Sequence, residues 1–263
     1  MPEAPAIHAS LLEMAVELAH QAGTLLLERR AEARLHTEGK KNVNDLVTAA
    51  DRASERLIVE RIRAARPSDG IIGEEGNRTN PESPIQWVID PLDGTMNYVH
   101  GCGPFAVSIG VEVAGEPQVG VVRVVLTEET FSAIKGNGAY CNGKLLSASK
   151  VDTLATAVIG FDGATEPDVR KKQATILSKM LSEVRDFRRI GSCATSMCWA
   201  AAGRFDAFFQ HGSGHWDISA GTVIAREAGA WVGSRDDDVP TPAETLVAAP
   251  GISDALRKAI KGA

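Results

Sequence analysis

The stretch from Trp87 to Thr95 constrains the fold more strongly than any other part of the sequence. An apolar run, Trp87-Val88-Ile89, is followed at once by Asp90-Pro91-Leu92-Asp93-Gly94-Thr95. Short runs of aromatic and β-branched residues are typical of buried strands, and proline and glycine mark the point where such a strand ends. We therefore expect a buried strand that delivers the carboxylates of Asp90 and Asp93 to a turn.

Two carboxylates so close together would repel each other unless a cation lay between them. Oxygen ligands without a nearby histidine or cysteine suit Mg²⁺, Ca²⁺ or Mn²⁺ better than Zn²⁺. The Leu92 carbonyl is a further candidate ligand, and the amides of Gly94 and Thr95 are free to face an anion. In isolation a solvated turn explains the same residues equally well, so the other segments of the chain must decide.

Composition places the chain among globular proteins without membrane spans. Its 263 residues suit one large domain or two small ones, and 44% hydrophobic with 24% charged residues disfavour disorder. No apolar stretch approaches the ~18 residues of a spanning helix, and the N-terminus lacks a secretion signal, so we expect a cytoplasmic protein. The four cysteines are expected to be reduced. A net charge of −6 argues against broad binding to nucleic acid or anionic membranes.

Two helices are expected before the central stretch. Apolar residues recur at three- and four-residue spacings from Leu11 to Arg30, which predicts an amphipathic helix. A polar stretch at residues 38–44 has the composition of a loop. Thr48 and Asp51 then have the spacing of a capping box, so we expect a second helix to begin there and to end near Pro67.

The rest of the chain predicts a mixture of strands and helices. Residues 71–76 repeat the plan of the central stretch, with Glu74 and Glu75 at the end of a short apolar run. An antiparallel meander is expected over residues 105–113, 118–126 and 130–135. Further strands are expected at residues 157–161, 207–210, 230–232 and 246–249, and helices at residues 168–181, 216–227 and 252–260. Residues 190–194 are expected to lead into an alanine-rich helix that runs to about Gly203.

Four separated segments together resemble the inositol monophosphatase family. They are Asp45-Leu46-Val47-Thr48-Ala49-Ala50-Asp51, Gly73-Glu74-Glu75, Asp90-Pro91-Leu92-Asp93-Gly94-Thr95-Met96-Asn97-Tyr98 and Trp216-Asp217-Ile218-Ser219-Ala220-Gly221. Each motif is weak alone, whereas their combination in this order is specific. The resemblance implies an α+β fold, a layered α/β/α/β/α sandwich that usually forms a homodimer. Because no repeat or long linker interrupts the chain, we expect one compact catalytic unit over residues 1–263, with approximate sub-lobes at 1–150 and 151–263.

The resemblance also implies Mg²⁺-dependent, lithium-sensitive hydrolysis of a phosphate monoester, with two to three ions. Glu74, Asp90 and the Leu92 carbonyl would hold the first ion. Asp90, Asp93 and Asp217 would hold the second, so that Asp90 bridges both. A third, weaker ion would lie near Glu74.

The expected catalytic residues are Glu74, Thr95 and Asp51. A water activated by metal, oriented by Glu74 and by Thr95 hydrogen-bonded to Asp51, would attack phosphorus in line. The amides of Gly94 and Thr95 would hold phosphoryl oxygens. Lys40 matches a loop lysine of the family that lies near the active site.

Substrate contacts are less closely defined by the resemblance. They are expected at Asp93, Gly94, Thr95, Gly191, Ser192, Cys193, Gln210 and Asp217. In inositol-hydrolysing members a glutamate contacts the inositol hydroxyls at the position of Gln210. Glutamine still donates and accepts hydrogen bonds but lacks the anionic acceptor, so this departure puts inositol selectivity in question.

Several functions therefore stay open at the level of sequence. Inositol 1-phosphate or a similar small polyol phosphate is the leading substrate. The alternatives on the same fold are histidinol phosphate, fructose 1,6-bisphosphate and a 3'-phosphonucleotide. An alternative of another class is a non-catalytic regulatory partner, although such a role has no evident need for the complete carboxylate set.

Overall fold

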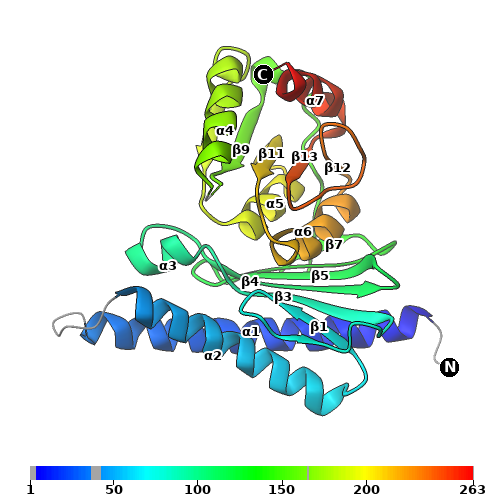
Figure 1. Ribbon diagram of the computed structural model, residues 1–263. Helices are drawn as coiled ribbons and strands as arrows, with labels where there is room; N and C mark the ends of the chain where they lie inside the picture. The colour runs from blue at the N-terminus through cyan, green and yellow to red at the C-terminus, as the bar shows by residue number, and fades with distance from the viewer. Residues whose placement is uncertain (1–3, 37–42, 165, 263) are drawn as a thin grey trace.

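Two β-sheets separated and flanked by helices make up the protein (Figure 1). The structure is a computed structural model that describes residues 4–36, 43–164 and 166–262. The first sheet contains, in spatial order, β2 (Arg78–Thr79), β1 (Gly70–Gly73), β3 (Ile85–Asp93), β4 (Ala106–Val113), β5 (Glu116–Val124), β6 (Glu129–Ile134), β7 (Ala139–Cys141) and β8 (Lys144–Leu145). The second contains β10 (Asp186–Arg189), β9 (Val158–Asp162), β11 (Ala207–His211), β13 (Glu244–Ala248) and β12 (Trp231–Gly233).

Helices cover both outer faces and fill the space between the sheets (Figure 1). The α-helices are α1 (Ala4–His36), α2 (Val43–Ala65), α3 (Thr95–His100), α4 (Pro167–Met180), α5 (Cys193–Ala201), α6 (His215–Glu227) and α7 (Ser253–Lys261). Short 3₁₀ turns lie at Leu154–Thr156 and Pro250–Ile252. Among the described residues, no helix combines the length and the apolar character needed to cross a bilayer.

Three apolar cores hold these layers together. In the first, Leu18 of α1 and Ile58 of α2 pack with Trp87 of the first sheet. In the second, side chains of α5 and α6 pack against both sheets at once. In the third, Ile176 of α4 and Leu256 of α7 pack on the outer face of the second sheet. The order helix, sheet, helix, sheet, helix confirms the expected layered α+β sandwich.

Most of the expected elements are present. The meander is confirmed, since β4, β5 and β6 pair antiparallel in sequence order. Strands β2 and β10 were not expected, because both are short and polar. The capping interpretation of Thr48 and Asp51 was wrong, because α2 already begins at Val43. The helical spacing of apolar residues extends back from Ala50 to Val43 and outweighs the local capping signal.

Glycines let α6 lie directly on the first sheet. A Cβ atom added to Gly120 of β5 would collide with the Ala220 carbonyl oxygen, and one added to Gly110 of β4 would collide with the Ser219 hydroxyl. Side chains at these two positions would therefore push the helix away from the sheet. Helix α6 therefore packs closely against β4 and β5 at Ser219 and Ala220.

We predict that Gly120→Ala destabilises the protein by about 1–3 kcal/mol, because a new methyl group meets backbone that cannot easily move. Chemical denaturation would measure the free energy of unfolding. Gly23→Ala in α1 is the matched control, because its new Cβ would lie 3.4 Å from the nearest atom, in Val125. That control should leave stability unchanged or raise it by up to about 1 kcal/mol. Equal stability of both variants would contradict the prediction.

Candidate active site

An irregularity in β3 turns two aspartates toward the same side. Asp90 lies opposite Ser108 of β4, but Asp93 lies opposite Ala106, so three steps along β3 match two along β4. In a regular strand, side chains three residues apart face opposite sides of the sheet. The extra residue of this bulge brings both carboxylates to one side. The strand therefore continues through both aspartates, where the sequence suggested that it ended before them.

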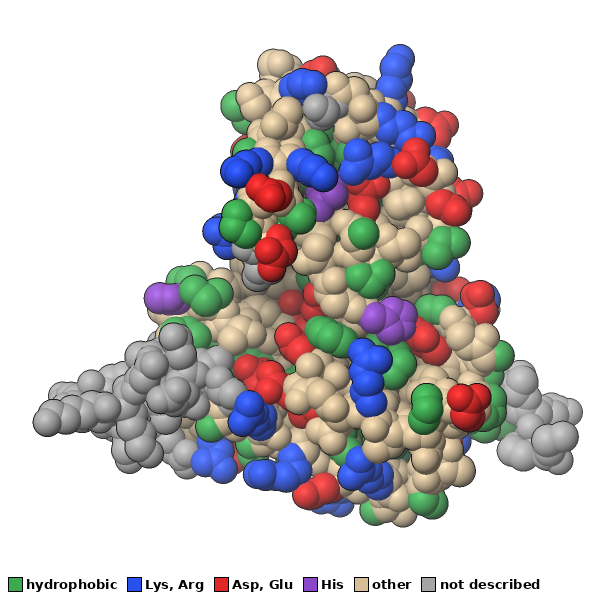
Figure 2. Space-filling view, viewed as in Figure 1, with side chains coloured by type: hydrophobic (Ala, Val, Ile, Leu, Met, Phe, Trp, Pro, Cys, Tyr) green, Lys and Arg blue, Asp and Glu red, His purple; other side chains and the backbone are tan. Residues whose placement is uncertain are grey.

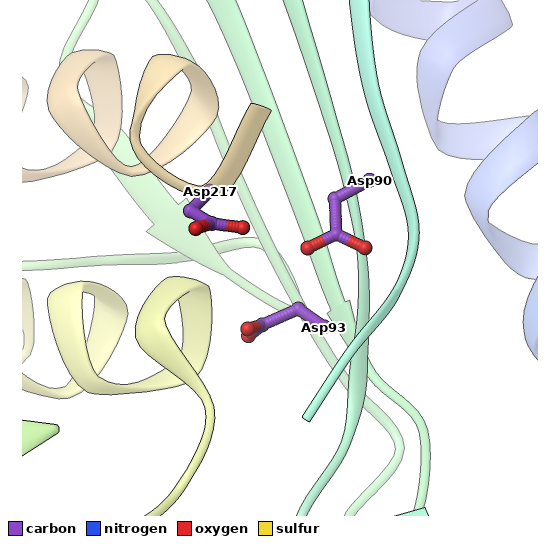
Figure 3. Close-up of side chains that lie close together, drawn as sticks. All are labelled: Asp90, Asp93 and Asp217. Carbon is purple, nitrogen blue, oxygen red and sulfur yellow. The ribbon is translucent and has the colours of Figure 1, made fainter. Parts of the chain in front are cut away.

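Asp217 approaches from the middle helical layer. It lies in the first turn of α6, where its carboxylate accepts a hydrogen bond from the Gly214 amide at 2.7 Å. One carboxylate oxygen each from Asp90, Asp93 and Asp217 lie within 4.8 Å of one another. Figure 3 shows the three side chains close together, with Asp217 at the start of α6 across from Asp90 and Asp93. In the space-filling view, acidic side chains gather at the waist between the parts of the surface that hold the two sheets (Figure 2).

Burial makes this arrangement electrostatically costly. Asp90 is 2% exposed and Asp93 is 6% exposed. Loss of hydration, followed by the charges of Glu74 and Asp93, raises the pKa of Asp90 well above its ordinary value. Burial and then the charge of Asp217 raise the pKa of Asp93 to about 7, and burial also raises the pKa of Asp217. No lysine or arginine in the described part of the chain forms an ion pair with these three carboxylates.

Glu74 and Asp51 extend the acidic cluster. Strand β1 runs parallel to β3 with Gly73 beside Ile89, so Glu74 follows β1 next to Asp90. Although part of its side chain is exposed, loss of hydration raises the pKa of Glu74 to about 7, against the effect of a hydrogen bond with Asp90. Burial and the nearby Glu74 charge raise the pKa of Asp51 to about 8. Among the described residues, none is hydrogen-bonded to the buried Asp51 Oδ1.

The donor set fits divalent cations that prefer oxygen. Several buried carboxylates face one another with raised pKa values, and an unpartnered carboxylate oxygen lies beside them. A cation bound among them would remove both the mutual repulsion and the unmet hydrogen-bonding capacity. Histidine and cysteine take no part in the cluster that the described residues form, which favours Mg²⁺, Ca²⁺ or Mn²⁺ over Zn²⁺.

The sequence profile of the inositol monophosphatase family matches residues 8–261. The chain belongs to the inositol monophosphatase family. This confirms the resemblance that the separated acidic motifs suggested, and it places the carboxylate cluster in a family of phosphatases.

Relatives span almost the whole protein. Inositol-1-monophosphatase SuhB from Mycobacterium tuberculosis is 38% identical over 277 aligned residues, which cover 96% of this chain and 94% of that protein. A protein named Nus factor SuhB from Pasteurella multocida is 40% identical over 228 residues, which cover 84% of each. A solved structure of Mycobacterium tuberculosis SuhB is similar with a TM-score of 0.84, at 39% identity and with 97% of both chains covered.

One hydrogen bond expected from the sequence of this chain was wrong. The Thr95 hydroxyl donates its hydrogen bond to the Leu92 carbonyl oxygen at 3.1 Å, not to Asp51. The reason is local, because Gly94 is left-handed with a φ of 89° and turns the first residue of α3 back over the end of β3. The Leu92 carbonyl keeps a second lone pair that can face a ligand.

The start of α5 binds a carboxylate of the chain itself. The Ser192 hydroxyl donates to Asp93, and the amides of Cys193 and Ala194 donate to the two oxygens of Asp93 at 3.0 and 2.9 Å. Ser192 and Cys193 were expected to contact the substrate. In the structure they position Asp93, since a helix N-terminus favours a negative charge. Gly191 precedes them in a left-handed conformation, with a φ of 81°.

Two residues that sequence reasoning missed hold the loop before α5. Asp162 accepts hydrogen bonds from the Gly191 amide at 2.5 Å and the Ser196 hydroxyl at 2.9 Å. Asn97 Nδ2 donates to the Ile190 carbonyl at 2.8 Å. The signal for Asp162 was an acidic residue at the end of an expected strand, the same signal that identified Asp90.

A third missed residue is Glu55 of α2, which is fully buried. Its carboxylate accepts the Glu75 amide at 2.9 Å and the Asn77 side-chain amide at 2.6 Å, so it holds the loop that carries Glu74. The sequence offered one indication of the buried position of Glu55, because this glutamate is next to the apolar positions of the expected helix.

Gln210 and Lys40 complete the expected set. Successive residues of β11 face opposite sides, and Phe208 packs in the core that α5 and α6 share. Gln210 therefore faces the same helices, and its buried Oε1 has no hydrogen-bond partner in the part of the chain that the structure describes. Lys40 lies outside the described residues.

The raised pKa values predict a pH-dependent loss of stability in chelator-treated protein. Folded Asp90, Asp93 and Glu74 keep protons that the unfolded chain releases above about pH 4, so stability falls as pH rises from about 4 to 8. We expect a lower Tm at about pH 8 than at about pH 5, and a smaller decrease in Asp90→Asn. Scanning calorimetry would measure both proteins. An identical decrease in the two would contradict the assignment of this effect to the cluster.

Proposed function

We propose that the protein is a Mg²⁺-dependent phosphomonoesterase that hydrolyses inositol 1-phosphate or a similar small polyol phosphate. The observation that carries this proposal is the convergence of Asp90, Asp93 and Asp217 within 4.8 Å of one another. Family membership supports the phosphatase class, and the oxygen-only ligands support Mg²⁺.

The proposed ligands divide between two main ions. Glu74, Asp90 and the Leu92 carbonyl would hold the first, and Asp90, Asp93 and Asp217 would hold the second. A third, weaker ion would lie beside Glu74. When bound, such ions supply positive charge that activates water and stabilises phosphoryl and leaving oxygens.

The chain's own groups would orient the reactants. Glu74 would orient the attacking water from its position beside Asp90 at the end of β1. The unpartnered Asp51 Oδ1 lies in the same acidic cluster and orients that water by accepting a hydrogen bond. The amides of Gly94 and Thr95 face the phosphoryl oxygens. Because the Thr95 hydroxyl is bonded to Leu92, its part in orienting the water would require a change of acceptor.

The substrate's polar groups would meet Gln210 and the loop at Gly191. A buried, unpartnered amide oxygen at Gln210 favours a ligand that donates a hydrogen bond, as a hydroxyl group does. Histidinol phosphate, fructose 1,6-bisphosphate and a 3'-phosphonucleotide are the alternative substrates.

Phosphate release from these four substrates, each with and without Mg²⁺, tests the proposal. A metal-dependent preference for inositol 1-phosphate is expected. Preference for another of the four would change the substrate and keep the mechanism. Release from none of them, with or without Mg²⁺, would contradict the enzymatic function.

We predict that Asp93→Asn lowers turnover by at least about 10³-fold, because the second ion loses a charged ligand. Circular dichroism should show that the variant is folded. Asp186→Asn is the control, because this carboxylate is exposed and pairs with Arg188 at the surface. Near-normal turnover in Asp93→Asn would refute the ligand assignment.

We also predict inhibition by Li⁺ at millimolar concentration, which follows from the family resemblance. Steady-state assays with LiCl, matched against NaCl for ionic strength, would measure it. Activity that responds equally to the two salts would count against lithium sensitivity.

The name of the Pasteurella relative, Nus factor SuhB, favours a second candidate function. In this alternative the chain acts as a non-catalytic regulatory partner. The two candidates separate in the phosphatase assay, because only the enzyme needs Asp93. We further propose a cytoplasmic homodimer with sub-lobes at 1–150 and 151–263. The position of the first sheet before Leu145 and of the second after Val158 supports that division.

A further inference from the structure

We propose that Glu112 is a positioning residue that fixes the start of α6, and with it Asp217, against the strands that carry the other carboxylates. This inference rests on the proposed metal site. It concerns a pair of residues, Glu112 and His215, that lies outside all four acidic motifs.

Glu112 is bound to both ends of the first turn of α6. It lies on β4 and is 5% exposed. Its Oε1 lies 2.8 Å from His215 Nε2 and accepts a hydrogen bond from the Ser219 hydroxyl, also at 2.8 Å. A buried carboxylate needs such partners, and their loss would leave its charge without compensation. The contact is therefore specific to this position of the helix on the sheet.

The helical geometry directs the effect toward Asp217. His215 and Ser219 are four residues apart, so they lie on one face of α6. Asp217 is midway between them in sequence and lies in the first turn of the helix. When Glu112 fixes this turn against β4, it also fixes the end of α6 from which the Asp217 carboxylate, bonded to the Gly214 amide, approaches Asp90 and Asp93.

Strand β4 transmits this position to β3. Ser108, Gly110 and Glu112 alternate onto the same face of β4, and each contacts α6 or permits its close approach. The Ser108 hydroxyl donates to the Trp216 carbonyl oxygen at 3.4 Å, and Gly110 leaves room for Ser219. Ser108 is itself the pairing partner of Asp90. The separation of Asp217 from Asp90 is thus set through β4.

A purely structural role for Glu112 can be separated from a positioning role by a control in the same helix. Glu227 at the other end of α6 accepts the amides of Gly136 and Gly138, each at 2.8 Å. It matches Glu112 in charge and in the number of hydrogen bonds, and it lies ten residues from Asp217. Its removal should weaken α6 without moving Asp217.

The experiment is calorimetric titration with Mg²⁺ alone of the wild type and of Glu112→Ala, Glu112→Gln, His215→Ala and Glu227→Ala. We expect Glu112→Ala to weaken Mg²⁺ binding by about 10–100-fold, as loss of supporting residues around metal ligands commonly does. Glu112→Gln should recover part of this loss, because its amide oxygen still accepts from Ser219. Glu227→Ala should bind as the wild type does. His215→Ala keeps the test decisive if Glu112→Ala does not fold, because its side chain is partly exposed.

Wild-type affinity in folded Glu112→Ala or His215→Ala would overturn the inference. An equal loss in Glu227→Ala would also overturn it, because general weakening of α6 would then explain the result. Failure of the wild type to bind Mg²⁺ would instead refute the proposed function, and the inference with it.

Discussion

Mutual repulsion among Asp90, Asp93 and Asp217 is the constraint on which the rest of the structure depends. Their oxygens lie within 4.8 Å of one another in a largely buried position, so packing elsewhere must hold them together. The bulge in β3 aligns two of them, and the close contact of α6 with Gly120 brings in the third. The amides at the start of α5 balance part of the charge on Asp93. A divalent cation bound by these carboxylates would neutralise the negative charge that remains.

Stability and function therefore oppose each other at this site. The carboxylates whose burial raises their pKa values destabilise the folded state without a cation, and the same carboxylates are the proposed ligands. Three kinds of group offset this destabilisation. Glycines permit close packing, amides at the start of a helix donate hydrogen bonds to a carboxylate, and buried carboxylates such as Glu55 hold loops in place. The five-layer sandwich supports this arrangement, because side chains of both sheets share the core around α5 and α6.

The sequence could predict what is encoded locally. Apolar runs ending in carboxylates identified Asp90 and Asp93, and the resemblance of the motif at residues 216–221 to the family added Asp217. It could not predict contacts between residues far apart in the chain, such as Glu112 with Ser219 or Asp162 with Ser196. The Thr95 hydroxyl was assigned the wrong acceptor because the left-handed turn at Gly94 decides its direction. The motif around Ser192 and Cys193 likewise does not show that Asp93 occupies the start of α5. The division into two sub-lobes stays a prediction.

Anomalous diffraction from crystals soaked in Mn²⁺ would test the metal centre most directly, because Mn²⁺ shares the oxygen preference of Mg²⁺ and scatters anomalously. We expect one peak bounded by Asp90, Asp93 and Asp217 and another bounded by Asp90, Glu74 and the Leu92 carbonyl. Crystals that diffract well and show no peak at these carboxylates would contradict the proposal that the carboxylates bind divalent cations.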